Sequence, residues 1–286
     1  MNPRTHAIKT GLQRGWTEFI LSLRSPQDQG FYLFMALVTL GYLWLNRNSE
    51  IEGSGMTLFL PSFAMPSILG AFIAFALVIG PGYSLAMERE DGTLLRSKAV
   101  PHGMTGYVAG QVVLHSAGII PMFLVILVPG LFLFEGLMQN GLAGWATVIW
   151  VTVLGLLATL PIGIILGSLV PGVQKMGTWG FFPIMALVAI SGIFFPIQAL
   201  WGWIQTVAQV FPVYWLGLGM RSAFLPDAAA ALEIGGTWRT IETIVVLALW
   251  AVVGLLVAPR VLQRMARRQS GSAVEAARQE AGQWVR

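Results

Sequence analysis

Six long apolar stretches, separated by short polar segments, dominate the 286-residue sequence. A helix needs about 20 residues to cross roughly 30 Å of hydrocarbon, so stretches of this length predict membrane-spanning helices. Only 10% of the residues are charged, which is too few to solvate the surface of a globular domain of this size. We therefore expect an all-α polytopic membrane protein. The predicted spans are Gly30–Leu45, Pro61–Ala86, Tyr107–Phe134, Leu142–Val170, Gly177–Ile197 and Ile241–Val261.

The basic residues predict the orientation of these spans. With a cytoplasmic N-terminus and alternating spans, 14 of the 17 Lys and Arg residues fall on the cytoplasmic side, and only Arg47, Arg221 and Arg239 fall outside. Cytoplasmic loops of membrane proteins carry an excess of Lys and Arg, so both termini are expected in the cytoplasm. The net charge of +4 does not indicate nucleic-acid binding, because the basic residues form no continuous patch among aromatic and polar side chains that could contact bases.

The chain is predicted to form one transmembrane domain, residues 1–286, with a helical segment before the bundle and a tail after it. Residues 1–29 predict an amphipathic helix on the cytoplasmic membrane surface, or a helix packed on a soluble partner. The six-span bundle covers 30–262, and 263–286 form a basic cytoplasmic tail. The apolar face of the first helix consists of Ile8, Leu12, Trp16, Phe19, Ile20 and Leu23. The residues expected to meet anionic headgroups, or else a partner protein, are Arg260, Arg264, Arg267 and Arg268.

Two glycine pairs inside the apolar stretches allow neighbouring helices to approach closely. These are Gly106 with Gly110, and Gly163 with Gly167. This spacing is common in apolar helices. It predicts that another helix packs closely there, but it does not identify that helix.

The sequence lacks the motifs of several enzyme classes. It contains no P-loop, no H-E-x-x-H zinc motif, no G-x-S-x-G elbow and no Cys. No Asp or Glu lies in the middle of a span, which argues against proton or sodium coupling. His115 lies in the third span, where we favour a neutral imidazole bonded to a neighbouring helix over a proton relay. A transport protein without its own energy source must take energy from a partner.

The densest cluster of charges lies between the second and third spans, at Glu88–Gly103. Gly92 is expected to end one helix, and Thr93 to cap a short surface helix over Leu94–Ala99 that stops before Pro101.

Leu94 and Leu95 would give this short helix an apolar knob, with Arg96 and Lys98 at its rim. A knob with a charged rim suits docking into a cleft of a soluble partner. A solvated cytoplasmic loop explains the same residues equally well.

Two stretches resemble the ABC-2 type permeases, the membrane subunits of one class of ABC exporters. The first carries the pattern E-x-E-x-G-T…P at Glu88, Glu90, Gly92, Thr93 and Pro101. The second runs from Ser191 to Pro196, then through Trp203, Gln209-Val-Phe-Pro212 and Arg221, and resembles the family's segment between its fifth and sixth spans. Within the family the sequence is most similar to permeases of the daunorubicin-resistance type, which export antibiotics, other lipophilic compounds or lipids.

The resemblance implies that the charged segment is a coupling helix with its lead-in, seated on a separate nucleotide-binding subunit. It also implies two copies of that subunit, a second permease half that is identical or homologous, and a contact with membrane lipids. ATP and Mg²⁺ would be bound by the partner, with no cofactor or metal in this chain. The implied coupling residues are Glu88, Arg89, Glu90, Asp91, Gly92, Thr93, Leu94, Leu95 and Pro101.

The same resemblance implies that Gln198–Phe211 and Tyr214–Phe224 are two re-entrant external helices dipping into the outer leaflet. An ordinary amphipathic loop is the alternative. A stretch this apolar but broken by proline cannot be a seventh span. The residues that mark this segment are Pro196, Trp203, Pro212 and Arg221.

The second and fifth spans line the substrate path in this family. Because no acidic residue lies mid-span, we expect neutral or weakly polar hydrophobic cargo. Each residue of the path could instead face lipid or pack against another helix. The implied path residues are Met65, Phe72, Phe75, Phe182, Met185, Phe194 and Phe195.

The function expected from sequence is export of hydrophobic, antibiotic-like molecules across a bacterial plasma membrane. ABC-2 export of a lipid or polysaccharide for the cell envelope is one alternative, and a non-transporting membrane scaffold is another. Arg outnumbers Lys fourteen to three, which is typical of a GC-rich bacterial genome.

Overall fold

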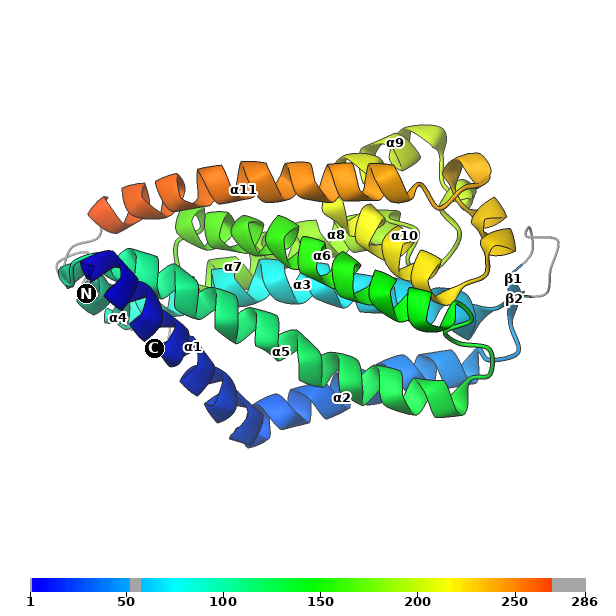
Figure 1. Cartoon of the computed structure of the whole chain (residues 1–286), viewed down its shortest axis with the longest axis horizontal. Coiled ribbons are helices and arrows are strands. Elements are labelled where there is room, and N and C mark those ends of the chain that lie inside the picture. The colour runs from blue at the N-terminus through cyan, green and yellow to red at the C-terminus, as the bar shows by residue number, and fades with distance from the viewer. Residues whose placement is uncertain (1, 52–57, 269–286) are drawn as a thin grey trace, which may run out of the picture.

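The computed structural model describes residues 2–51 and 58–268, and its long helices lie side by side along one axis (Figure 1). The prediction of an all-α membrane protein is confirmed. Five segments of the described chain are long and apolar enough to cross a membrane. They are α3 (Leu60–Glu90), α5 (Gly103–Leu133), α6 (Gly141–Leu169), the pair α7–α8 (Val173–Ile190) and α11 (Thr240–Arg268).

The first predicted span, Gly30–Leu45, corresponds to α2, Pro26–Leu45. Ser25 separates it from α1, Pro3–Arg24, and ends one helix while capping the next. Its hydroxyl accepts a hydrogen bond from the backbone N–H of Asp28 at 3.3 Å. Pro26 follows at the first helical position, where its missing N–H costs nothing. The result is a sharp elbow between α1 and α2 (Figure 1).

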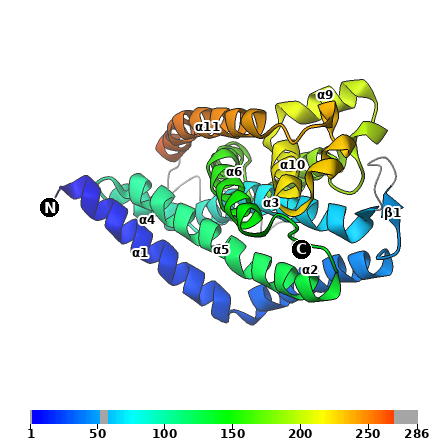
Figure 2. The same ribbon diagram turned by 45° about the vertical axis from the view of Figure 1, so that its right-hand side comes forward.

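Helix α1 packs along α5 through glycine (Figures 1 and 2). A Cβ atom added at Gly11 would lie 1.9 Å from the carbonyl oxygen of Gly106, and one at Gly15 would lie 2.2 Å from that of Gly110. The sequence analysis identified the glycine pair of α5 but not its partner. Leu12 and Trp16, on the predicted apolar face of α1, stay 43% and 55% exposed, because the glycine stripe faces α5 instead.

The second predicted glycine pair also forms a close contact, between α6 and α3. A Cβ at Gly163 would lie 2.5 Å from the carbonyl oxygen of Leu77. A Cβ at Gly167 would lie 2.7 Å from the Cα of Gly82. These backbone contacts let α3 and α6 pack closely against each other.

The fifth predicted span, Gly177–Ile197, differs from the structure at both ends. The helical segment begins at Val173 and consists of α7 (Val173–Trp179) and α8 (Phe181–Ile190). Pro183 has no N–H to donate to the carbonyl of the preceding turn, which explains the interruption near Gly180. After Ile190 the chain turns through Gly192, whose φ is +66°.

Two short helices follow, within a few residues of the predicted bounds Gln198–Phe211 and Tyr214–Phe224. They are α9 (Gly202–Val210) and α10 (Pro212–Phe224), preceded by the 3-10 turn η1 (Ile197–Ala199). The break falls at Phe211, directly before Pro212, as the sequence predicted. Helix α10 is almost wholly buried and packs on α3, α6 and α11. In contrast, Trp203 on α9 is 66% exposed.

Arg221 anchors α10 from the inside. Its Nε lies 2.5 Å from Glu233 Oε1, and its Nη1 donates to Ser67 Oγ at 2.9 Å and to the Gly192 carbonyl at 3.1 Å. The guanidinium also lies over the ring of Phe63. Both charged side chains are fully buried, and Arg221 links α10 to α3 and to the turn after α8.

The remaining elements close the same end of the bundle. Strand β1 (Glu50–Ile51) pairs antiparallel with β2 (Leu58–Phe59). The 3-10 turns η2 (Asp227–Leu232) and η3 (Ile234–Gly236) lead into α11. At the other end α11 continues to Arg268, so the first residues of the predicted tail are helical; the rest of the tail lies outside the described residues.

Candidate functional site: the charged bend and a lateral cavity

The charged segment between α3 and α5 forms a tight bend followed by a helix of about two turns. Helix α3 ends at Glu90, and Gly92 has a φ of +82°, a conformation that favours glycine. Helix α4 then covers Thr93–Ala99. The predicted cap at Thr93 is wrong: Thr93 is the first helical residue, and its backbone N–H donates to Asp91 Oδ1 at 2.7 Å.

Leu94 does not form part of an exposed knob, in contrast to the sequence prediction. Its side chain is 1% exposed and belongs to the core cluster of the bundle, because the turn at Gly92 directs this face of α4 inward. Leu95 is half-buried. The exposed face of this segment carries Arg96, Lys98 and Val100, followed by Pro101.

Three consecutive residues tie the bend to three other helices. Glu88 Oε1 accepts from Arg14 Nη2 of α1 at 3.0 Å. Arg89 Nη1 donates to the carbonyls of Gly167 and Val170 at the end of α6, at 3.2 and 3.1 Å. Glu90 Oε1 accepts from the backbone N–H of Val173, the first residue of α7, at 2.7 Å. The bend is therefore braced to α1, α6 and α7 at once.

This bracing gives the bend a mechanical connection to the bundle. Positive charge at the C-terminus of a helix and negative charge at its N-terminus are both favourable, so Arg89 and Glu90 suit their positions on α6 and α7. Arg14 is shared by Glu88 and Glu18, which lies 2.6 Å away on α1. If α4 moves relative to the bundle, the bonds from Glu88, Arg89 and Glu90 must either be stretched or move their partner helices.

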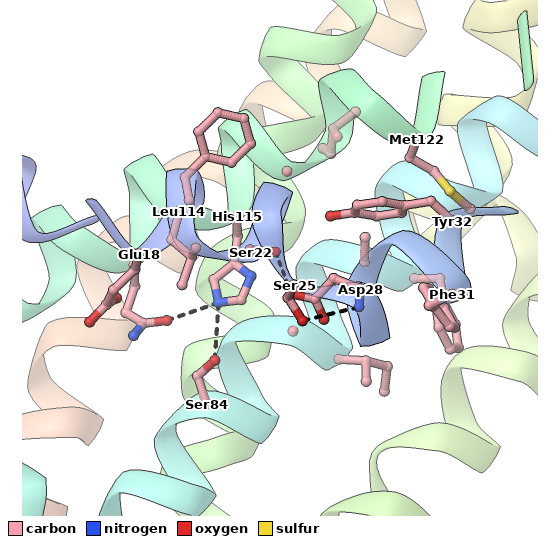
Figure 3. Close-up of a pocket in the computed structure, with 18 of the residues that line it drawn as sticks. Glu18, Ser22, Ser25, Asp28, Phe31, Tyr32, Ser84, Leu114, His115 and Met122 are labelled. Atoms are coloured by element: carbon pink, nitrogen blue, oxygen red, sulfur yellow. Dashed lines mark hydrogen bonds between the residues drawn. The ribbon is translucent and has the colours of Figure 1, made fainter. Parts of the chain in front are cut away.

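A cavity of about 700 Å³ lies between the α1–α2 elbow, α3 and α5. Figure 3 shows Ser22, Ser25 and Asp28 gathered at the elbow, and Tyr32 reaching in from α2. Ser22 Oγ donates to Asp28 Oδ2 at 2.6 Å. The volume falls in the range of sites for drug-sized molecules.

The wall opposite the elbow carries a short polar row. His115 Nε2 lies 2.9 Å from Gln111 Oε1 and 3.4 Å from Ser84 Oγ (Figure 3). The contact with Ser84 of α3 agrees with the predicted role of His115 as a bridge to a neighbouring helix. Gly80 leaves room for the imidazole, since a Cβ there would lie 2.7 Å from His115 Nδ1.

The residues of the predicted substrate path fall into separate places. Phe72 and Phe75 line the cavity. Phe75 meets Phe181 edge to face at 5.7 Å, and Phe181 meets Phe182 at 5.9 Å. This aromatic row leads from the cavity to the exposed surface of α8, where Phe182 is 66% exposed.

The other predicted path residues do not contact the cavity. Met65 is fully buried in the core, where its methyl group occupies the space beside Gly130. Met185 is half-buried on α8. Phe194 and Phe195 lie in the turn after α8, about 40% exposed.

The sequence did not lead us to expect that α1 contacts the charged bend, or that the α1–α2 elbow forms part of the cavity. Gly11 and Gly15 have the same four-residue spacing as the glycine pair of α5, and this was the available signal for the contact. Asp28 follows a Ser-Pro cap, which marks a helix start but does not indicate a cavity. The Arg14–Glu88 pair joins residues 74 positions apart and left no sequence pattern.

The fold, the braced bend and the short helices α9 and α10 are consistent with the resemblance seen in the sequence, and a comparison with known families supports it. The sequence model of the ABC-2 type transporter family matches residues 8–225, from α1 to the end of α10. No curated protein matches the chain. Because the match covers well over half of the sequence, the chain belongs to the ABC-2 type transporter family and is a membrane permease component of an ABC transporter.

Proposed function

We propose that this chain is the permease of an ATP-driven exporter that moves hydrophobic, antibiotic-like molecules out of a bacterial cell. It lies in the plasma membrane with both termini in the cytoplasm and pairs with a second permease half. Two copies of a separate nucleotide-binding subunit bind ATP and Mg²⁺ and dock on α4. The daunorubicin-resistance branch of the family is the proposed relationship.

The braced bend is the observation that supports this proposal. Glu88, Arg89 and Glu90 bond to α1, α6 and α7, so a push on α4 reaches three parts of the bundle. One of these, α1, lines the cavity, and so does α3, the helix that carries the bend. ATP-driven closure of the partner subunits thus has a direct route to the place where a hydrophobic ligand fits.

The exposed side of α4 defines what the partner surface requires. Arg96 and Lys98 are exposed, and Val100 is 59% exposed directly after them. A partner cleft with an apolar floor and acidic rim complements this surface. Leu94, which is buried in the permease, supports α4 from behind.

The test is export and ATP hydrolysis by the assembled complex with Gly92→Val. A branched residue at a φ of +82° is strained, by roughly 1–2 kcal/mol or more, so the bend must change shape. The control is Gly235→Val, because Gly235 has a φ of +80° in η3 with open space around it.

Gly92→Val is expected to abolish stimulation of ATP hydrolysis by substrate and to stop export, while Gly235→Val retains both. Membrane insertion of each variant is checked by surface labelling and by elution as a single species. Export at the wild-type rate by an inserted Gly92→Val variant contradicts the proposal, and so do equal rates of ATP hydrolysis with and without the permease.

A further inference from the structure

We propose that the cavity beneath the α1–α2 elbow binds an amphipathic organic cation, with the charge near Asp28, Glu18 and Glu88 and the apolar body against α3 and α5. The claim that this cation is the exported cargo rests on the proposed export function. The claim that the cavity binds the cation depends only on the residues that line the cavity.

The charges around the cavity favour a cation. Three carboxylates line it, from Glu18, Asp28 and Glu88. No Lys or Arg occurs among the described residues of the lining, and His115 is its one imidazole. Arg14, behind the lining, pairs with both Glu18 and Glu88. Glu18 and Glu88 therefore share one guanidinium, and Asp28 has no ion-pair partner within the described part of the chain, so an excess of negative charge remains.

Two of these carboxylates have capacity left for a ligand. Glu88 Oε2 is buried and has no hydrogen-bond partner within the described part of the chain. Asp28 Oδ2 accepts a hydrogen bond from Ser22 Oγ, and the backbone N–H of Asp28 donates to Ser25 Oγ at the start of α2. An ionised carboxylate accepts up to about four hydrogen bonds, so one bond from a serine does not saturate Asp28. A buried carboxylate without a full set of partners is stabilised by a cation.

The rest of the lining suits a hydrophobic body. It is formed by aromatic and flexible apolar side chains from α2, α3 and α5. Aromatic faces attract organic cations, and methionine adapts to ligands of different shape. The residues closest to this description are Phe31, Tyr32, Met35, Phe72, Phe75 and Met122.

This placement changes the cargo expected from sequence. No acidic residue lies mid-span, which favoured a neutral molecule. The elbow, however, brings Asp28 from the start of α2 and Glu18 from α1 to the cavity that Phe72 and Phe75 of α3 also line. The acidic and apolar groups become neighbours only in the folded chain.

The experiment measures binding of tetraphenylphosphonium to the purified full-length permease in a neutral maltoside detergent. Triphenylphosphine oxide, an uncharged molecule of similar shape, is the matched ligand. Saturable binding of the cation, at least about tenfold tighter than that of the oxide, is expected when a carboxylate contributes to affinity. Equal affinity for the two ligands overturns the proposal.

Asp28→Asn tests the position of the charge. It is expected to weaken cation binding about five- to tenfold and to leave binding of the oxide unchanged. Asp227→Asn is the control, since Asp227 is an exposed carboxylate at the start of η2, away from the cavity. Unchanged cation affinity in a folded Asp28→Asn variant places the ligand elsewhere and overturns the proposal.

Gly118→Leu tests the location of the apolar body without altering a charge. Gly118 lines the cavity and has open space where a side chain would begin, so leucine fills the cavity without a clash at its Cβ. Gly41→Leu is the control, because Gly41 on α2 also has open space but does not line the cavity. Loss of cation binding in Gly118→Leu alone is expected, and equal binding by both variants overturns the proposal.

The source of the cation is separated by competition. Displacement of the probe by phosphatidylethanolamine, but not by phosphatidylglycerol, identifies a lipid ammonium as the occupant; displacement by neither identifies a soluble amphiphile. Binding needs no ATP-binding subunit, so its failure is distinct from failure of export. If the permease binds the cation but exports nothing, the cation site stands and the proposed export function is wrong. If the permease exports but does not bind the cation, the export function stands and the cation site is wrong.

Discussion

At the residue scale, glycine decides which helices of this protein can touch. Gly11 and Gly15 of α1 lie against the backbone of Gly106 and Gly110 of α5. Small residues let backbones approach, and in a membrane this packing replaces the hydrophobic effect as a reason for helices to associate. The contact holds α1 close enough for Arg14 to reach Glu88.

Gly11→Ala is therefore expected to destabilise the protein, although alanine is the better helix former. Its Cβ would lie 1.9 Å from the Gly106 carbonyl oxygen, so α1 must move away from α5. Gly41→Ala, in open space on α2, is expected to be neutral or to gain up to about 1 kcal/mol from helix propensity. Thermal unfolding in detergent compares the two, and a Gly11→Ala variant as stable as Gly41→Ala would show that the glycine contact is dispensable.

The buried Arg221–Glu233 pair is a second residue-scale feature with a measurable consequence. Arg221→Met leaves the carboxylate of Glu233 buried without its partner, which costs about 3–5 kcal/mol in comparable sites. We expect a large fall in melting temperature, and partial recovery in the double variant Arg221→Met with Glu233→Leu. Arg264→Met, at an exposed position of α11, is the control. No recovery in the double variant would show that Arg221 acts through Ser67 and Gly192 instead.

At the element scale, the bend that joins α3 to α4 and α5 is bonded to the rest of the bundle. The short helix α4 has its own core contact through Leu94, and the end of α3 is bonded to α1, α6 and α7. Of these bonds, the one from Glu90 to the N-terminus of α7 joins the bend to the helix that continues into α8.

Glu90→Ala is expected to lower substrate-stimulated ATP hydrolysis by the assembled complex about five- to tenfold, within the usual range of coupling between sites. Basal hydrolysis should remain, because the partner subunit carries the ATP site. The matched control is Glu135→Ala, an exposed glutamate in the loop after α5. Stimulation equal to wild type in Glu90→Ala would mean that α7 takes no part in coupling.

How much of these elements the sequence predicts depends on the range of the interaction. Hydrophobic length fixed the number and order of the long helices, and Gly92 and Pro212 marked breaks that the structure contains. The interruption at Gly180 was missed although Pro183 marks it, because hydrophobic length alone does not distinguish one continuous helix from two. The inward face of Leu94 and the cavity depend on contacts between distant segments, which no local pattern records.

At the scale of the whole molecule, the bundle has two chemically distinct ends. One end carries α4, the start of α5 and the Arg-rich end of α11; the other carries the β-hairpin, η2 and η3 (Figure 1). An ABC transporter can use only one orientation, since its ATP-binding subunits work in the cytoplasm. The excess of Lys and Arg at the α4 end predicts that this end is cytoplasmic.

The absence of cysteine from the sequence makes this orientation directly testable. Arg96→Cys lies on the exposed face of α4, and Gln139→Cys lies exposed in the loop between α5 and α6 at the opposite end. In intact cells a membrane-impermeant maleimide is expected to label Gln139→Cys and not Arg96→Cys, and after permeabilisation it should label both. Labelling of Arg96→Cys in intact cells would place α4 outside, where no ATP-binding subunit could reach it, and would remove the route by which the bend drives transport.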